Sequence, residues 1–202
     1  MQFADAVHRR RMVRSFAPDP VPAPVLDSVL ATAQRGPSAG FTQGVELVVL
    51  EGPDQTAGYW QITLADSDAR DRFPWPGLLA APVLVVVVID PSAYVRRYAE
   101  PDKAASGLGG GEDRWPVPYW WVDAGMAAVL ALLAAVDEGL GGLFFGLFEH
   151  ERAVLGALGV PDRFRAAGTI ALGYPAPDDR PTGSAVTRPR RPPADVVHRG
   201  RW

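Results

Sequence analysis

The chain has 202 residues, of which 48% are hydrophobic and 21% charged, and its formal net charge is −3. This composition is too apolar for a disordered protein, and the length allows a sizeable core. The absence of cysteine excludes disulfides, thiolate metal sites and a cysteine nucleophile. The longest apolar runs, 78–89 and 124–136, are shorter than the roughly 20 residues of a membrane span, and the N-terminus lacks signal-peptide features. We therefore expect a soluble cytoplasmic protein.

Positive charge is concentrated at the two ends of the chain. Residues 1–16 contain four arginines and one aspartate, and residues 188–202 contain five arginines and one aspartate, so these segments carry +3 and +4. Residues 17–187 must then carry −10. A nucleic-acid-binding domain is usually basic, so this distribution favours a small anionic ligand held by arginines over a nucleic-acid partner. A solvated charged surface is the alternative.

Hydrophobic spacing predicts an alternation of helices and strands. A short helix is expected at residues 3–7 and a second over 26–33, separated by a proline-rich extended connector at 17–24. Segments rich in β-branched residues at 45–50 and 83–89 predict strands. The second is apolar at every position, so it should be buried on both faces.

The C-terminal half adds a long apolar helix and a last strand. The helix is expected over 124–136, with Asp123 as a candidate N-cap and glycines at 139–142 marking its exit. It is apolar on nearly all sides, which favours a central position or a subunit interface. The last strand is expected over 167–174. The alternation indicates an α/β or α+β layered fold, and residues 1–202 are predicted to form a single domain.

Two classes of catalytic site can be weighed from residue types. The three histidines are scattered, so no metal site is predicted. Gly36-Pro-Ser-Ala-Gly40 matches the Gly-x-Ser-x-Gly pattern of hydrolases, with Ser38 as the nucleophile. That motif requires a strand before the serine and a helix after it, whereas the predicted order here is reversed. A helix-terminating turn and a ligand-contacting loop are the other interpretations.

Six short motifs, in the same order along the chain, resemble those of the FMN-dependent nitroreductase family. They are Arg10-Arg-Met-Val-Arg14-Ser-Phe16, Gly36-Pro-Ser-Ala-Gly-Phe-Thr-Gln43, Asp123-Ala-Gly-Met-Ala-Ala with Gly139-Leu-Gly-Gly-Leu-Phe-Phe-Gly146, Leu158-Gly-Val-Pro161, Ala171-Leu-Gly-Tyr-Pro175 and Arg190-Arg-Pro-Pro-Ala-Asp-Val-Val-His198. Each motif is weak alone, but together they span nearly the whole chain.

The resemblance implies an α+β fold in which a mainly antiparallel central sheet is flanked by helices in a three-layer α/β/α sandwich. It also implies an intertwined homodimer with FMN at the subunit interface. The expected reaction transfers hydride from NADH or NADPH through flavin N5 to an electron-poor small molecule such as a nitroaromatic, quinone or enone. Flavin oxidases or dehydrogenases, flavin-fragmenting enzymes and deazaflavin-using enzymes on the same scaffold are alternatives. The flavin carries this chemistry, so no catalytic side chain is predicted.

The same resemblance implies the cofactor-binding residues. Arginines from both ends of the chain would hold the phosphate and ribityl chain, and Arg14 would face the N1/O2 edge of the flavin. The backbone amide at 145–146 would approach N5, and the loop 37–43 would come from the other subunit. The complete set is Arg10, Arg11, Met12, Arg14, Pro37, Ser38, Ala39, Gln43, Phe145, Gly146, Arg188 and Arg190.

Three positions depart from the family pattern. Met12 replaces the usual serine, Phe41 replaces the usual asparagine, and Gly44-Val45 replaces the usual Pro-Trp. Phe41 could favour a bulky aromatic substrate or simply fill space. The aromatic-rich segment 93–121 adds Tyr119 and Trp120 as candidate substrate residues, although its aromatic side chains could instead pack a dimer interface.

Overall fold

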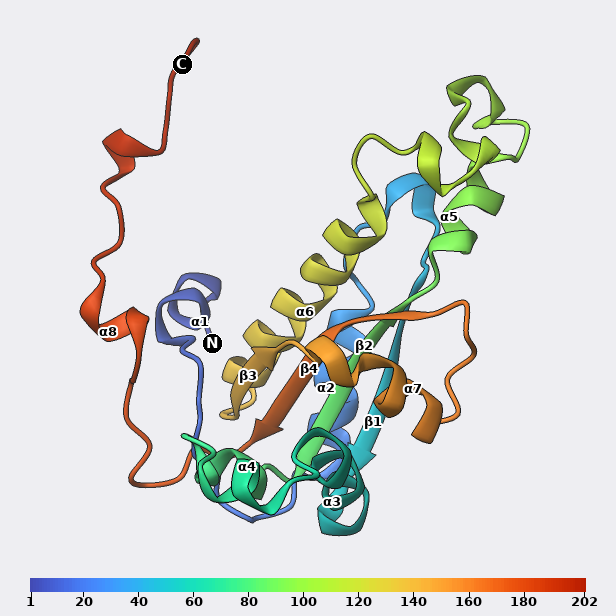
Figure 1. Ribbon diagram of the computed structural model, residues 1–202. Coiled ribbons are helices and arrows are strands. Elements are labelled where there is room, and N and C mark those ends of the chain that lie inside the picture. Colours follow the sequence, from blue (N-terminus) through green and yellow to red (C-terminus); the bar gives the residue numbers. More distant parts are fainter.

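A computed structural model describes residues 1–202, apart from the side chains at positions 67 and 69. Within the described residues, the strands form one four-stranded sheet in the order β1-β2-β4-β3 (Figure 1). The strands are β1 (Val45–Glu51), β2 (Val83–Ile89), β3 (Gly141–Phe145) and β4 (Arg165–Gly173). All three neighbouring pairs are antiparallel. The mainly antiparallel α+β sheet expected from the sequence is therefore confirmed.

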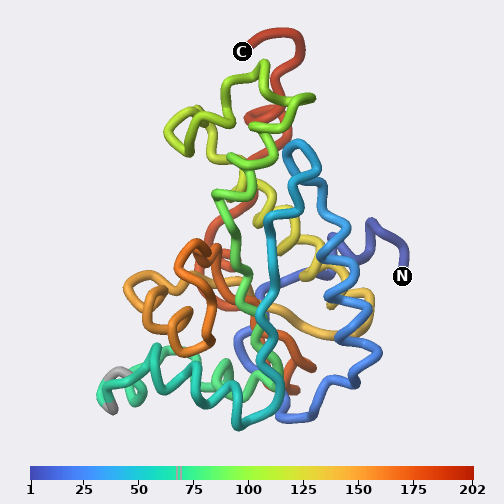
Figure 2. Tube along the Cα trace, turned by 90° about the vertical axis from the view of Figure 1, so that its right-hand side faces the viewer, coloured from blue at the N-terminus to red at the C-terminus, as the bar shows by residue number. Residues whose placement is uncertain are grey.

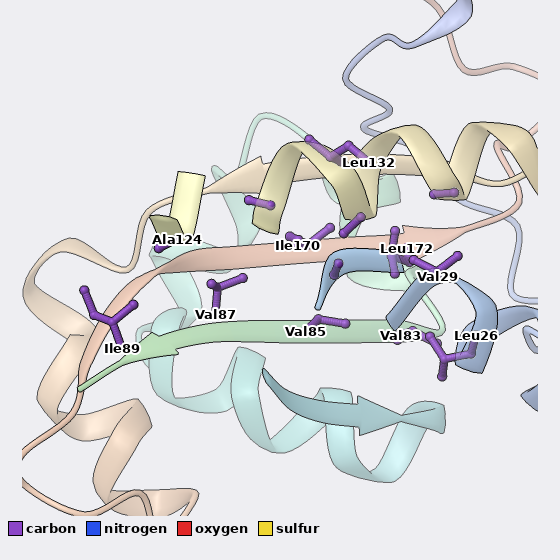
Figure 3. Packing of buried hydrophobic residues seen from close by; sticks show 14 of the residues in the cluster. Leu26, Val29, Val83, Val85, Val87, Ile89, Ala124, Leu132, Ile170 and Leu172 are labelled. Atoms are coloured by element: carbon purple, nitrogen blue, oxygen red, sulfur yellow. The ribbon is translucent and has the colours of Figure 1, made fainter. Parts of the chain in front are cut away.

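Helices cover both faces of this sheet. On one face, α2 (Ala23–Ala33) and α6 (Tyr119–Asp137) pack against side chains from β2 and β4 (Figure 3). On the other, α3 (Gly52–Thr63) and α7 (Glu151–Ala157) complete a second core cluster. The remaining helices are short: α1 (Phe3–Arg9), α4 (Ser67–Asp71), α5 (Pro91–Tyr98) and α8 (Ser184–Thr187). The three-layer α/β/α arrangement is thus confirmed.

Strand β2 is the centre of both cores, as its uninterrupted apolar sequence predicts. Successive side chains of a strand point to opposite faces. Accordingly Val83, Val85 and Val87 lie in the cluster with α2 and α6, whereas Leu84 and Val86 lie in the cluster with α3. Every residue of β2 is buried.

Helix α6 begins five residues earlier than predicted, and Asp123 is not its N-cap. The first turn starts after Pro118, so Asp123 lies inside the helix, where its carboxylate accepts hydrogen bonds from the loop at Ala39 and from Tyr94. Among the described helices, α6 is long and apolar enough by composition to cross a membrane. It packs against the sheet and α2, however, as the central helix of a layered fold does.

Strand β3 corrects the interpretation of the glycines at 139–142 as a simple exit turn. Gly141 and Gly142 are the first residues of the strand, and both are buried. A Cβ on Gly141 would lie 2.6 Å from Val13, and one on Gly142 would lie 2.7 Å from Leu132. Glycine is therefore required at 141, because the short, branched side chain of Val13 packs closely against this edge strand, whereas at 142 the nearest atom is the end of the flexible Leu132 side chain.

Two segments extend beyond the layers. Residues 91–118 project past one end of the sheet (Figure 2). Residues 180–202 are exposed throughout and run away from the layered body as an arm that includes α8 (Figure 1).

Candidate active site

The N-terminal arginine segment lies along β3, the strand that leads to the predicted flavin-contact turn. Met12 forms a parallel bridge with Gly142, and the amide of Val13 donates a 3.0 Å hydrogen bond to the carbonyl of Gly142. These contacts bring the motif at 10–14 and the motif at 139–146, which are far apart in sequence, onto one edge of the sheet.

Asp179 organises this arginine segment. Its carboxylate, with only 2% of the side chain exposed, accepts hydrogen bonds from the amides of Arg14 at 3.0 Å and Ser15 at 2.9 Å. Its other oxygen forms an ion pair with the guanidinium of Arg11. Arg11 is therefore charge-compensated within the subunit. Sequence reasoning missed Asp179, because nothing in the run Pro177-Asp-Asp-Arg180 distinguishes it from its solvent-exposed neighbour Asp178.

Arg14 is held differently, by an aromatic ring. Its guanidinium carbon lies 5.2 Å from the ring centre of Trp75, a cation–π contact. Trp75 contacts Phe73, Phe73 contacts Trp60, and Trp60 stacks on Phe145 with ring centres 5.9 Å apart. A continuous row of aromatic side chains thus connects the predicted N1/O2 cation with the predicted N5 turn.

Two aromatic residues, Tyr59 and Phe148, lie beside the predicted flavin-contact turn at Phe145-Gly146. Tyr59 packs edge-on against Phe145, and burial raises the pKa of Tyr59 to about 12, although its 2.9 Å hydrogen bond with Thr169 acts in the opposite direction. Phe148 has a positive φ of 48° and is 83% exposed. Its ring would lie 3.2 Å from a Cβ on Gly146, so the exposed Phe148 ring lies directly beside the turn.

The predicted loop at 37–43 immediately precedes β1, the edge strand on the side of the sheet opposite β3. It forms one wall of a cavity of about 440 Å³. The cavity is lined by Ala33, Gln34, Gly36, Pro37, Ser38, Gln43, Val45, Glu46, Leu47, Asp123 and Ala127. The Ser38 hydroxyl accepts a 3.0 Å hydrogen bond from the backbone amide of Gln43. Ser38 follows helix α2 and precedes strand β1. This order is the reverse of a hydrolase nucleophile turn.

The two parts of the predicted cofactor site do not meet within one subunit. β1 and β3 are opposite edges of the sheet. Three interstrand spacings of about 4.8 Å place these edges about 14 Å apart. Arg188 and Arg190 lie on the exposed C-terminal arm. A complete site would therefore need the loop from a second copy of the chain.

The three candidate substrate residues lie in different environments. Phe41 is 74% exposed and Tyr119 is 46% exposed. Trp120, by contrast, is only 6% exposed, because it packs against Tyr94 and Trp115 in an aromatic cluster within the subunit.

Comparison with known proteins shows the family of this chain. Residues 7–174 match the family model of the Nitroreductase family, and the chain belongs to that family. An NADH dehydrogenase of Thermus thermophilus is 28% identical to this chain, over an alignment that covers 88% of each chain.

Solved structures of similar proteins show the same fold. The NADPH:FMN oxidoreductase of Vibrio harveyi, in complex with NAD+, superposes with a TM-score of 0.70 at 22% identity, covering 99% of this chain and 77% of that one. An FMN-dependent nitroreductase of Clostridium difficile gives a TM-score of 0.67 at 18% identity, covering 98% of each chain.

Proposed function

We propose that this protein is a homodimeric, cytoplasmic FMN oxidoreductase, built as a single domain. It would take electrons from NADH or NADPH and reduce an electron-poor small molecule such as a nitroaromatic, quinone or enone. The observation that carries this proposal is that the arginine segment at 10–14 lies along β3, the strand that ends at the predicted N5 turn at Phe145-Gly146. The names of the similar proteins, which include an NADPH:FMN oxidoreductase, support the same choice of cofactor.

The residues present fit a flavin phosphate and an anionic flavin edge. The guanidinium of Arg11 is balanced by Asp179, whereas that of Arg14 rests on a neutral ring and keeps its net positive charge. When bound, FMN supplies hydride acceptance and donation at N5. The fixed charge of Arg14 would stabilise negative charge that develops on the N1/O2 edge. Arg10 and the arm residues Arg188 and Arg190 would bind the phosphate, for which the guanidinium fork is well suited.

An exposed apolar stripe on α6 supports the homodimer. Val122, Met126 and Val129 lie at helical spacing on one face and are 37%, 36% and 44% exposed. Apolar surface of this kind on a central helix indicates an interface. A second copy packed on this stripe would bring its 37–43 loop, which contacts the N-terminal part of α6, toward the basic site of the first.

The proposal is tested by anaerobic reduction of the FMN-loaded protein. NADH, NADPH and a reduced deazaflavin are each mixed with the protein while flavin absorbance is recorded. We expect one or both nicotinamides to bleach the flavin, and a nitroaromatic, quinone or enone to restore its colour. Bleaching by the deazaflavin alone would support the deazaflavin alternative. Reoxidation by dioxygen but by none of the three acceptors would support an oxidase.

A further inference from the structure

The loop that carries Phe41 has an unusual backbone. Gly40, Phe41 and Gln43 all have positive φ, of 62°, 55° and 54°. This region is uncommon for residues other than glycine and is disfavoured for a bulky aromatic residue. The conformation can persist only where surrounding contacts impose it.

Helix α5 and its C-terminal extension supply the first set of such contacts. The Arg97 Nε donates a 2.9 Å hydrogen bond to the carbonyl of Gly40, and Arg97 is itself held by two 2.7 Å hydrogen bonds to the carboxylate of Asp102. The ring of Tyr98 lies 2.7 Å from where a Cβ on Gly40 would stand. Arg97 therefore fixes the carbonyl at the loop's centre, and Tyr98 requires a glycine there.

Asp123 of α6 supplies the second set. Its buried carboxylate accepts hydrogen bonds from the amide of Ala39 at 2.9 Å and from the hydroxyl of Tyr94 at 2.8 Å. Tyr94 is fully buried, and its ring lies 2.5 Å from where a Cβ on Gly44 would stand. Burial raises the pKa of Tyr94 far above its ordinary value, and the hydrogen bond to Asp123 and its charge add to this effect, so the hydroxyl remains a donor.

While its neighbours are anchored, Phe41 itself points outward. Its 74% exposure leaves the ring without a packing role within the subunit. The positive φ and the exposed ring of Phe41 both reduce the stability of the folded chain. The contacts from α5 and α6 therefore maintain a conformation of Phe41 that does not stabilise the single subunit. In the proposed homodimer this loop would approach the basic site of the partner.

We propose that Arg97, Tyr98 and Asp123 are positioning residues that hold Phe41 as a fixed stacking surface for a flat aromatic acceptor. The inference rests on the proposed function and narrows its acceptor class to planar aromatic compounds. A ring held in place before binding loses little conformational entropy when a ligand stacks on it. Aromatic pairing of this kind corresponds to about a three- to tenfold gain in affinity.

The first test measures ligand binding without turnover. Binding of 2-naphthoate and of cyclohexanecarboxylate to the oxidised, FMN-loaded protein is followed by calorimetry in the absence of nicotinamide. Phe41→Ala should weaken 2-naphthoate binding about three- to tenfold and leave cyclohexanecarboxylate nearly unchanged, and Phe41→Tyr should restore the aromatic preference. Phe3→Ala is the matched control, because Phe3 is also 74% exposed, and it should change neither affinity.

The second test concerns the positioning residues. Arg97→Met removes the hydrogen bond to Gly40 with little change in length, so it should speed hydrogen exchange at residues 39–43 and lower the aromatic preference as Phe41→Ala does. Asp123→Asn keeps a carbonyl acceptor and should behave more like the wild type than Asp123→Leu. Because the loosened loop also carries Ala39 and Gln43, which are predicted to contact FMN, the FMN affinity of Arg97→Met is titrated first and the two ligand affinities are then compared at saturating FMN.

The outcomes separate this inference from the proposed function. Wild-type protein that binds FMN but whose ratio of aromatic to aliphatic affinity is unchanged by Phe41→Ala would overturn the inference alone. Faster exchange in Arg97→Met with an unchanged ratio would show that the loop contacts are only structural. Wild-type protein that takes up no FMN would overturn both.

Discussion

Replacing Asp179 tests whether one buried carboxylate shapes the basic half of the site. Its oxygens accept two backbone hydrogen bonds, from Arg14 and Ser15, and pair with Arg11. Asp179→Ala removes all three interactions, whereas Asp179→Asn keeps one carbonyl oxygen as an acceptor and loses the charge.

The size of the effect follows from these contacts. A hydrogen bond to a charged group contributes about 1.5 to 3 kcal/mol, so the two amides account for about 3 kcal/mol. Because 36% of the Arg11 side chain is exposed, its ion pair adds about 1 kcal/mol or less. We therefore expect Asp179→Ala to lower the free energy of unfolding by about 4 kcal/mol and Asp179→Asn by about 2 kcal/mol.

Urea unfolding at 25 °C measures this loss, and FMN titration measures its consequence for the site. Asp178→Asn is the control, because Asp178 is exposed and its contact with the Ser15 hydroxyl is long, at 3.4 Å. Both Asp179 variants should also bind FMN more weakly than Asp178→Asn, since residues 11–15 lose their fixed shape. Equal stability of Asp179→Ala and Asp178→Asn would refute the reasoning.

Three further predictions follow from the charges and surfaces. Arg188→Ala with Arg190→Ala should weaken FMN binding about a hundredfold if both contact phosphate, whereas Arg199→Ala with Arg201→Ala on the same arm should not; equal effects in a fluorescence titration would contradict the assignment. Val129→Glu places a charge in the apolar stripe and should halve the mass seen by light scattering; an unchanged mass would exclude this interface. The hydrogen bond from Arg165 lowers the pKa of Glu151 below its ordinary value of 4.5, so Glu151 stabilises the fold above that pH and the benefit is lost as pH falls through the lowered pKa. Glu151→Gln should therefore be less stable at pH 7 in urea unfolding, with a difference that shrinks below about pH 4.5; a difference independent of pH would contradict this.

The elements that sequence predicted best are those defined by local hydrophobicity. The run 83–89 is apolar throughout, and the strand occupies those residues and is buried on both faces. The glycines at 141–142 could not be recognised as a strand, because they pack closely against Val13, which is distant in sequence, and against Leu132 of the preceding helix. Asp123 suited a helix cap locally, but the helix starts earlier and the carboxylate bonds to a loop 84 residues away in sequence.

The same limit applies to the candidate site. Order and spacing of short motifs were sufficient to indicate the family, and the structure brings the motifs at 10–14 and 139–146 together. The residues that hold the site in shape could not be predicted from such motifs. Asp179, Trp75 and Arg97 act through tertiary contacts with the arginine segment and the 39–43 loop, and none belongs to a recognisable pattern. The assignments of individual residues to FMN remain predictions.

The central claim is that this chain binds FMN in a site completed by a second copy. The most direct test adds FMN to the purified, flavin-free protein, removes unbound flavin by gel filtration and measures absorbance and molecular mass together. The predicted result is one flavin per chain, eluting with a dimer. A colourless protein, or flavin bound stoichiometrically to a stable monomer, would contradict the account.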